Sequence, residues 1–163
     1  MEYADGLKVC VDEMDRNLKL QYEGVDALKA TARSVLSSAS LITALMTVLQ
    51  LARPNIQADY ISTYNTTIVL TMILYVSLIA TCVASISGIT MKAPIGADWE
   101  TLYQSFASKT EIELLRMQVA ALLQVVKLNE PIVNRQRWLV LTSCILLPII
   151  VFILLGLSLI PRY

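Results

Sequence analysis

The chain has 163 residues, of which 56% are hydrophobic and 16% charged, and its mean hydropathy is +0.61. This composition is too apolar for a water-soluble domain of that length. The formal net charge is zero and histidine is absent, so nothing indicates a nucleic-acid partner, and the commonest general base and metal ligand are missing.

Three stretches without a charged residue are long enough to cross a bilayer. They lie between Arg33 and Arg53, between Asp59 and Lys92, and between Arg137 and Arg162. A hydrocarbon core of ~30 Å takes about 20 helical residues. We therefore predict an all-α membrane protein with three transmembrane helices, at 34–52, 66–88 and 138–160.

Lys and Arg residues are unevenly distributed among the segments outside these spans. Eleven of them lie in residues 1–33 and 89–137, whereas the loop 53–65 and the tail 161–163 hold one each. Cytoplasmic segments of membrane proteins carry such an excess of positive charge. We expect the N-terminus and residues 89–137 to be cytoplasmic, and the loop 53–65 and the C-terminus to be outside.

Residues 6–33 carry a heptad pattern, with steps of four and three between its positions. These positions are Leu7, Val11, Met14, Leu18, Gln21, Val25, Leu28 and Ala32. The pattern predicts a helix that packs against other helices, as in a coiled-coil-like stalk. No proline or glycine interrupts residues 34–48, so we expect one helix from about Asp5 to Ala52, ~70 Å long, that ends before Pro54.

Hydroxyl-bearing and small residues form stripes in the first two spans. The first stripe is Ser37, Ser40, Ala44 and Thr47, and the second contains Ser77, Thr81 and Ser85. Lipid tails give no reason to keep hydroxyl groups in a span. The stripes indicate either close helix packing with interhelical hydrogen bonds or the lining of a pore.

The segment between the second and third spans contains two predicted helices. Asp98 is expected to cap a short helix that carries Trp99, Leu102, Tyr103 and Phe106. Thr110 and Glu113 form a capping box at the start of the next helix. Its apolar stripe is too broad for a lone solvated helix, and the N-terminal heptad helix is the available partner. The stripe is Ile112, Leu115, Val119, Leu122 and Val126.

Two prolines are predicted hinges. At Pro131 the helix either kinks or ends near Leu128 and restarts, and Pro148 bends the third span near its middle. Arg135, Arg137 and Trp138 form a predicted interfacial anchor at the start of that span.

The sequence contains no recognisable catalytic or metal-binding motif. No P-loop, GxGxxG, HExxH, GxSxG or CxxC pattern occurs, and no ionisable Asp, Glu, Lys, Arg or His lies within a predicted span. We therefore expect a protein that is not an enzyme, with no catalytic residue, metal ion or cofactor.

The stretch "ELLRMQVAALLQVVKLNEPIVNRQRWLVLTSCILL" joins a leucine-rich helix to a short basic patch and an apolar span. Together with the preceding helix and two spans, it resembles small bacterial transmembrane effectors of nucleotide-signalled antiphage defence, the Pycsar transmembrane effectors and the related SLATT proteins. The resemblance implies a homo-oligomeric effector that disrupts the inner membrane when a cyclic nucleotide binds. It also implies cationic contacts to the nucleotide phosphate, for which the candidates are Arg16, Lys19, Lys109, Arg116 and Lys127.

Two other interpretations remain open from the sequence. The heptad helix fits a structural or accessory subunit that binds a different membrane protein. A holin-like pore former, which needs no ligand, is the other alternative, although holins rarely need so long a cytoplasmic helical region.

Overall fold

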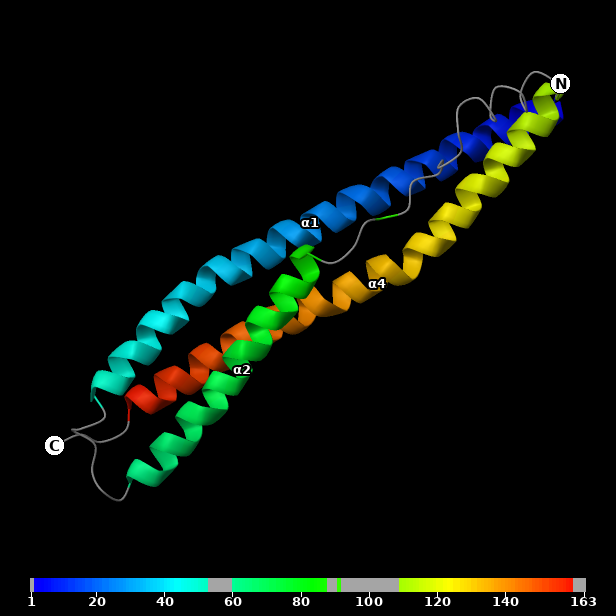
Figure 1. The fold of residues 1–163 in the computed structure, drawn as a ribbon. Coiled ribbons are helices and arrows are strands. Elements are labelled where there is room, and N and C mark those ends of the chain that lie inside the picture. Colours follow the sequence, from blue (N-terminus) through cyan, green and yellow to red (C-terminus); the bar gives the residue numbers. More distant parts are fainter. Residues whose placement is uncertain (1, 53–59, 88–90, 92–108, 160–163) are drawn as a thin grey trace. The chain divides into compact units, whose positions relative to one another are not determined.

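The computed structural model describes residues 2–52, 60–87, 91 and 109–159, and 97% of these residues are helical. The helices are α1 (Glu2–Ala52), α2 (Ile61–Ser87) and α4 (Glu111–Ser158), as labelled in Figure 1. All three are long and apolar enough to cross a membrane. Within the described residues there is no strand, which confirms the predicted all-α class.

The helix α1 is continuous from the heptad region into the first apolar stretch, as predicted. Its buried positions continue the heptad spacing well beyond residue 33. They are Val11, Leu18, Val25, Ala32, Val35, Ala39, Ile42, Met46 and Leu49. A strict seven-residue repeat keeps the same stripe of a helix turned toward its neighbours over many turns, which is the geometry of a left-handed supercoil.

Other boundaries differ from the sequence-based prediction. The helix α2 begins at Ile61, whereas the predicted span began at residue 66, so residues 61–65 of the predicted loop are helical. The hydroxyl of Tyr64 donates a hydrogen bond to the backbone carbonyl of Leu49, and this buried contact holds the first turn of α2 against α1. The predicted short helix at Asp98, with Trp99, lies outside the described residues.

The helix α4 passes through both Pro131 and Pro148 without a break. An end near Leu128 followed by a restart, one of the two alternatives for Pro131, is therefore wrong. A proline removes one backbone donor and crowds the preceding turn, but a helix whose flanking turns are packed can tolerate that local loss. The side chains of Pro131 and Pro148 are both exposed.

The chain divides into two compact units. The two-helix unit comprises residues 1–27 and 89–135, and the three-helix unit comprises residues 28–88 and 136–163. In the two-helix unit, Val11 and Leu18 of α1 form a buried cluster with Leu122 and Val125 of α4. The predicted pairing of the heptad helix with the apolar stripe of the later helix is therefore present within one chain.

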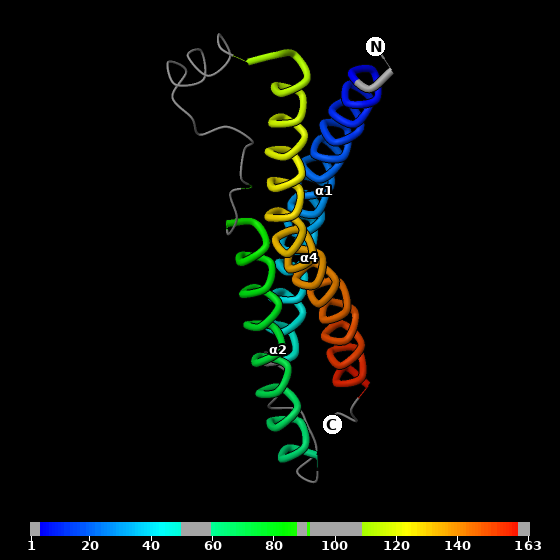
Figure 2. Tube along the Cα trace, turned by 90° about the vertical axis from the view of Figure 1, so that its right-hand side faces the viewer, coloured from blue at the N-terminus to red at the C-terminus, as the bar shows by residue number. Residues whose placement is uncertain are grey.

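In the three-helix unit, α2 runs antiparallel to both α1 and α4 (Figures 1 and 2). Along α2, Tyr64 and Tyr75 bond to successively earlier carbonyls of α1, those of Leu49 and Ala39. The core is formed by apolar residues of all three helices: Val35, Ala39, Ile42, Met46, Leu49, Tyr64, Ile68, Leu78, Cys82, Ile150, Leu154 and Leu157.

The outward surface of the three-helix unit is also apolar. Large side chains there remain widely exposed, up to 83% at Leu159; the others include Phe152, Leu41, Val48, Val69, Ile73 and Val76. In water such a surface would be unfavourable, whereas lipid tails solvate it without cost. The burial pattern therefore agrees with a membrane-spanning bundle.

Candidate functional site

Three polar residues interrupt the buried stripe of α4 at a constant spacing of seven. The stripe runs through Leu122, Asn129, Gln136, Ser143, Ile150 and Leu157, and all six are buried. Asn129, Gln136 and Ser143 are each fully enclosed, with 0% of their surface exposed. Buried polar residues at core positions of helix bundles require specific partners, so they fix the register of the helices at a cost in stability.

Gln136 closes the C-terminal end of α2. Its Nε2 atom donates to the backbone carbonyl of Ser85 at 3.1 Å. Since α2 ends at Ser87, this carbonyl is one of the last four in the helix and has no intrahelical donor. The side chain from α4 thus caps this carbonyl and joins α2 to α4.

A second polar contact between α2 and α4 lies deeper in the bundle. The hydroxyl of Ser143 is 2.9 Å from Thr81 Oγ1 and 2.9 Å from the carbonyl of Leu139 on its own helix. Thr81 in turn donates to carbonyls of α2, at 3.0 Å to Ser77 and 2.9 Å to Leu78. We call Thr81, Ser85, Gln136 and Ser143 the polar seam of α2 and α4.

The N-terminus of α4, outside the apolar stretches, is held by the predicted capping box. Thr110 N donates to Glu113 Oε2 at 2.9 Å, and Glu113 N donates to Thr110 Oγ1 at 3.4 Å. Glu111 forms a 2.8 Å ion pair with Lys8 of α1, which ties the same ends of the two helices together. The two helices of this unit are therefore parallel. The ion pair joins residues that come first in both helices, and the cluster of Val11 and Leu122 joins residues that come later in both.

These contacts shift the pKa values of the two glutamates downward. Hydrogen bonds from the backbone and hydroxyl of Thr110 lower the pKa of Glu113 below 4.5. The hydrogen bond and charge of Lys8 lower the pKa of Glu111 and raise that of Lys8. A depressed carboxyl pKa stabilises the folded form above the unfolded pKa, and this stabilisation is lost as pH falls through the folded pKa. Capping by Glu113 therefore weakens as the pH falls from the ordinary carboxyl pKa toward the lowered pKa of the folded form.

Replacing Thr110 with alanine is expected to fray the first turn of α4. Removing an N-cap hydroxyl costs about 1 kcal/mol because one backbone donor loses its partner. Thr110→Ser, which keeps the hydroxyl, should have almost no effect. Hydrogen exchange of the amides of residues 111–114 distinguishes the two variants, with faster exchange expected only for Thr110→Ala. Equal exchange in both variants would show that the bond from Glu113 N to the Thr110 hydroxyl contributes nothing.

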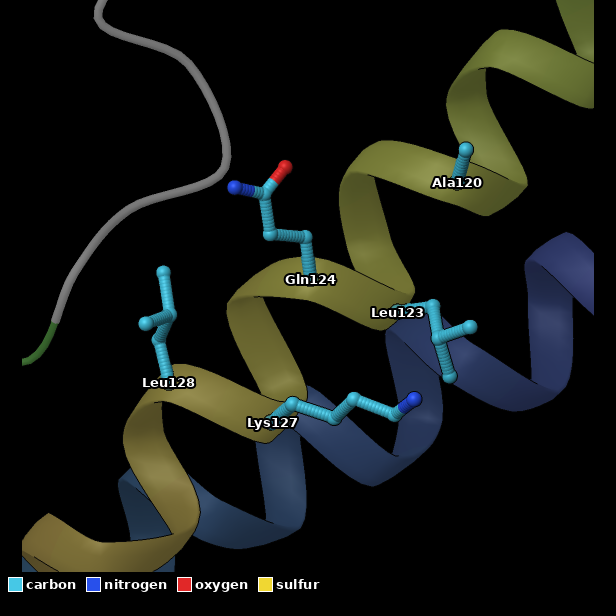
Figure 3. A pocket seen from close by; sticks show the side chains of 5 residues that line it. All are labelled: Ala120, Leu123, Gln124, Lys127 and Leu128. Atoms are coloured by element: carbon cyan, nitrogen blue, oxygen red, sulfur yellow. The ribbon is translucent and has the colours of Figure 1, made fainter.

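The five candidate phosphate contacts are all exposed, and one of them lines a surface hollow. Lys127 borders this hollow together with Ala120, Leu123, Gln124 and Leu128 of α4 (Figure 3). Lys19 Nζ lies 3.9 Å from Glu23 Oε1 on its own helix, and Lys109 Nζ lies 2.9 Å from Met117 Sδ. Arg16 and Arg116 lie on exposed positions of α1 and α4.

The stripe predicted on the first span faces away from the core. Ser37, Ser40, Ala44 and Thr47 are all exposed, and the hydroxyls of Ser40 and Thr47 donate to the carbonyls of Ser37 and Thr43 on the same helix. Within a single chain the stripe encloses no space. On α2, the second stripe passes from exposed Ser77 through half-buried Thr81 to fully buried Ser85.

The predicted anchor residues Arg135, Arg137 and Trp138 are exposed, and Trp138 retains 69% of its accessible surface. Gln136, which lies between the two arginines, was not singled out from the sequence. The available signal was its position seven residues after Asn129 and seven before Ser143, a spacing that places all three on the stripe begun by Leu122.

In the part of the chain that the structure describes, no group of three or more Cys, Asp or Glu side chains is placed to hold a metal ion. Comparisons of the chain with family models, curated proteins and solved structures find no match.

Proposed function

We propose that this protein is an oligomeric membrane effector of antiviral defence, which permeabilises the inner membrane when a cyclic nucleotide binds its cytoplasmic helices. The observation that carries the proposal is the continuity of α1 and α4. Each helix contributes a polar-surfaced segment to the two-helix unit and an apolar segment long enough to span the membrane. A ligand that shifts the first segment of such a helix acts on the second without any intervening loop.

The excess of Lys and Arg in residues 1–33 and 89–137 supports a cytoplasmic location for the two-helix unit. In that unit, the hollow beside Lys127 offers a nucleotide both kinds of contact that it needs. The ammonium group supplies a charge-assisted hydrogen bond to a phosphate, and Gln124 supplies an amide. Leu123 and Leu128 provide apolar surface for a base.

Homo-oligomerisation is supported by the exposed stripe on α1. Lipid does not favour small and hydroxyl-bearing residues over large apolar ones, whereas close helix packing does. We propose that Ser37, Ser40, Ala44 and Thr47 meet other copies of the chain. When the effector opens, the stripe lines the passage between them.

The test is dye release from proteoliposomes that contain the purified full chain, with a panel of cyclic mono- and dinucleotides. We expect release with one nucleotide of the panel. Lys127→Gln should raise the half-maximal concentration of that nucleotide about tenfold or more, because a hydrogen bond from a charged donor is worth about 1.5–3 kcal/mol. Lys19→Gln is the matched control, since Lys19 is exposed but does not line the hollow.

Ser40→Leu tests the role of the stripe. The variant should release no dye, because the leucine obstructs the close packing of copies at the stripe and fills the passage with apolar side chains. Release without any nucleotide would instead favour a holin-like pore former. No release from protein that is inserted and folded, and that remains monomeric, would favour an accessory subunit of another membrane protein.

A further inference from the structure

Two buried polar atoms of the polar seam have no hydrogen-bond partner. They are Ser85 Oγ and Gln136 Oε1, and both residues are 0% exposed. The 3.1 Å bond from Gln136 Nε2 to the Ser85 carbonyl already brings these two residues together. A buried polar group without a partner costs about 1–3 kcal/mol, so two on one pair of residues are a large local penalty.

Ser85 differs from the neighbouring hydroxyl residues of its helix. The side chains of Thr66, Thr67, Thr71, Ser77, Thr81 and Ser87 each donate to the carbonyl one turn earlier. In these six residues the hydroxyl proton is therefore already used within α2. The hydroxyl of Ser85 makes no such bond, so its proton remains available in the seam.

The chemistry of the two free atoms selects a neutral ligand that both donates and accepts. Ser85 offers a hydroxyl proton, and the amide oxygen of Gln136 accepts one. A hard cation such as Ca²⁺ needs about six to eight oxygen ligands, far more than these two atoms supply. A water molecule needs only two to four partners, and it can accept from Ser85 while it donates to Gln136.

We propose that the seam binds a water molecule between Ser85 Oγ and Gln136 Oε1. Each of these atoms has less than 1 Å² of accessible surface in the closed packing, so the water enters when α2 and α4 separate slightly at this end of the seam. The bound water satisfies both atoms and offsets the loss of local packing. The site is a property of the three-helix unit and stands independently of any nucleotide response.

The test is water-edited NMR of the full chain in lipid nanodiscs. Magnetisation transfer from water should reach the backbone amides of Ser85 and Gln136 several times faster than the backbone amide of Thr71. Thr71 is also 0% exposed, but its hydroxyl donates to the carbonyl of Thr67 at 2.7 Å. The double variant Ser85→Ala with Gln136→Met keeps similar volumes and removes both unpartnered atoms. In this variant, transfer at positions 85 and 136 should fall to the rate at Thr71.

Two results would overturn the proposal. One is transfer in the wild-type chain that is no faster at Ser85 and Gln136 than at Thr71. The other is fast transfer that persists in the double variant, which would mean that water reaches these positions without the two polar groups. The wild-type comparison decides the matter even if the double variant fails to fold.

Discussion

Leu18→Asp is expected to separate α1 from α4 in the two-helix unit. Leu18 is 6% exposed and packs in the cluster with Val11, Leu122 and Val125. The substitution removes the apolar contacts of the leucine and places a carboxylate among apolar side chains without a partner. Together these effects should cost about 3–5 kcal/mol, a large share of what a two-helix contact can supply.

Leu20→Asp is the matched control, because Leu20 lies on the same helix two residues away and is 54% exposed. Hydrogen exchange of the full chain in nanodiscs measures both variants. Amides of residues 5–25 and 111–130 should exchange at least about 100-fold faster in Leu18→Asp, since 1.4 kcal/mol corresponds to a factor of ten. They should be nearly unchanged in Leu20→Asp. Equal exchange in the two variants would contradict the pairing of α1 with α4.

Ile150→Ala should produce a large loss of stability in the three-helix unit. Ile150 is 0% exposed and belongs to the core cluster with Leu154 and Leu157. Within a bilayer, lipid tails are as apolar as the side chain itself, so packing contacts hold the helices together. The cavity that alanine leaves removes these contacts, and we expect a cost of about 2–4 kcal/mol.

The neighbouring residue provides the control for this substitution. Ile149 has the same side chain but is 42% exposed, so Ile149→Ala should be nearly neutral. Unfolding can be followed in mixed SDS and detergent micelles by thiol labelling of Cys82, which is 0% exposed in the folded chain. Cys10 and Cys144 are exposed and would be replaced by serine beforehand. The labelling midpoint should move to lower SDS only for Ile150→Ala.

Much of the fold could be predicted from the sequence because it depends on patterns among residues that are close together in the chain. Uncharged stretches define the apolar parts of the three helices, and the heptad steps from Leu7 onward define which stripe of α1 is buried. The capping box at Thr110 was predicted for the same reason, since both of its members lie within one turn. The start of α2 at Ile61 was missed because Ser62, Thr63 and Asn65 are typical of a loop. A tertiary contact, from Tyr64 to α1, decides that turn instead.

The polar seam lies beyond what such patterns determine. Periodicity indicates which residues share a face of α2 or α4, but it does not say which faces meet. Ser85 was therefore assigned to a stripe without its partner, and Gln136, between the two arginines of the predicted anchor, was not singled out. The pairing depends on the relative axial positions of two antiparallel helices, which are fixed by residues about 50 positions apart in the chain.

The pairing of Leu18 with Leu122 also sets a delay during synthesis. The two residues are separated by about 100 positions, and ribosomes add roughly 5–20 residues per second. For several seconds after Val11 and Leu18 leave the ribosome, their partner helix does not yet exist. The apolar stretches of α1 and α2 must be inserted into the membrane in the meantime. The nascent chain therefore presents an uncovered apolar stripe to water, so a holding chaperone or a second nascent copy has time to bind it before α4 arrives.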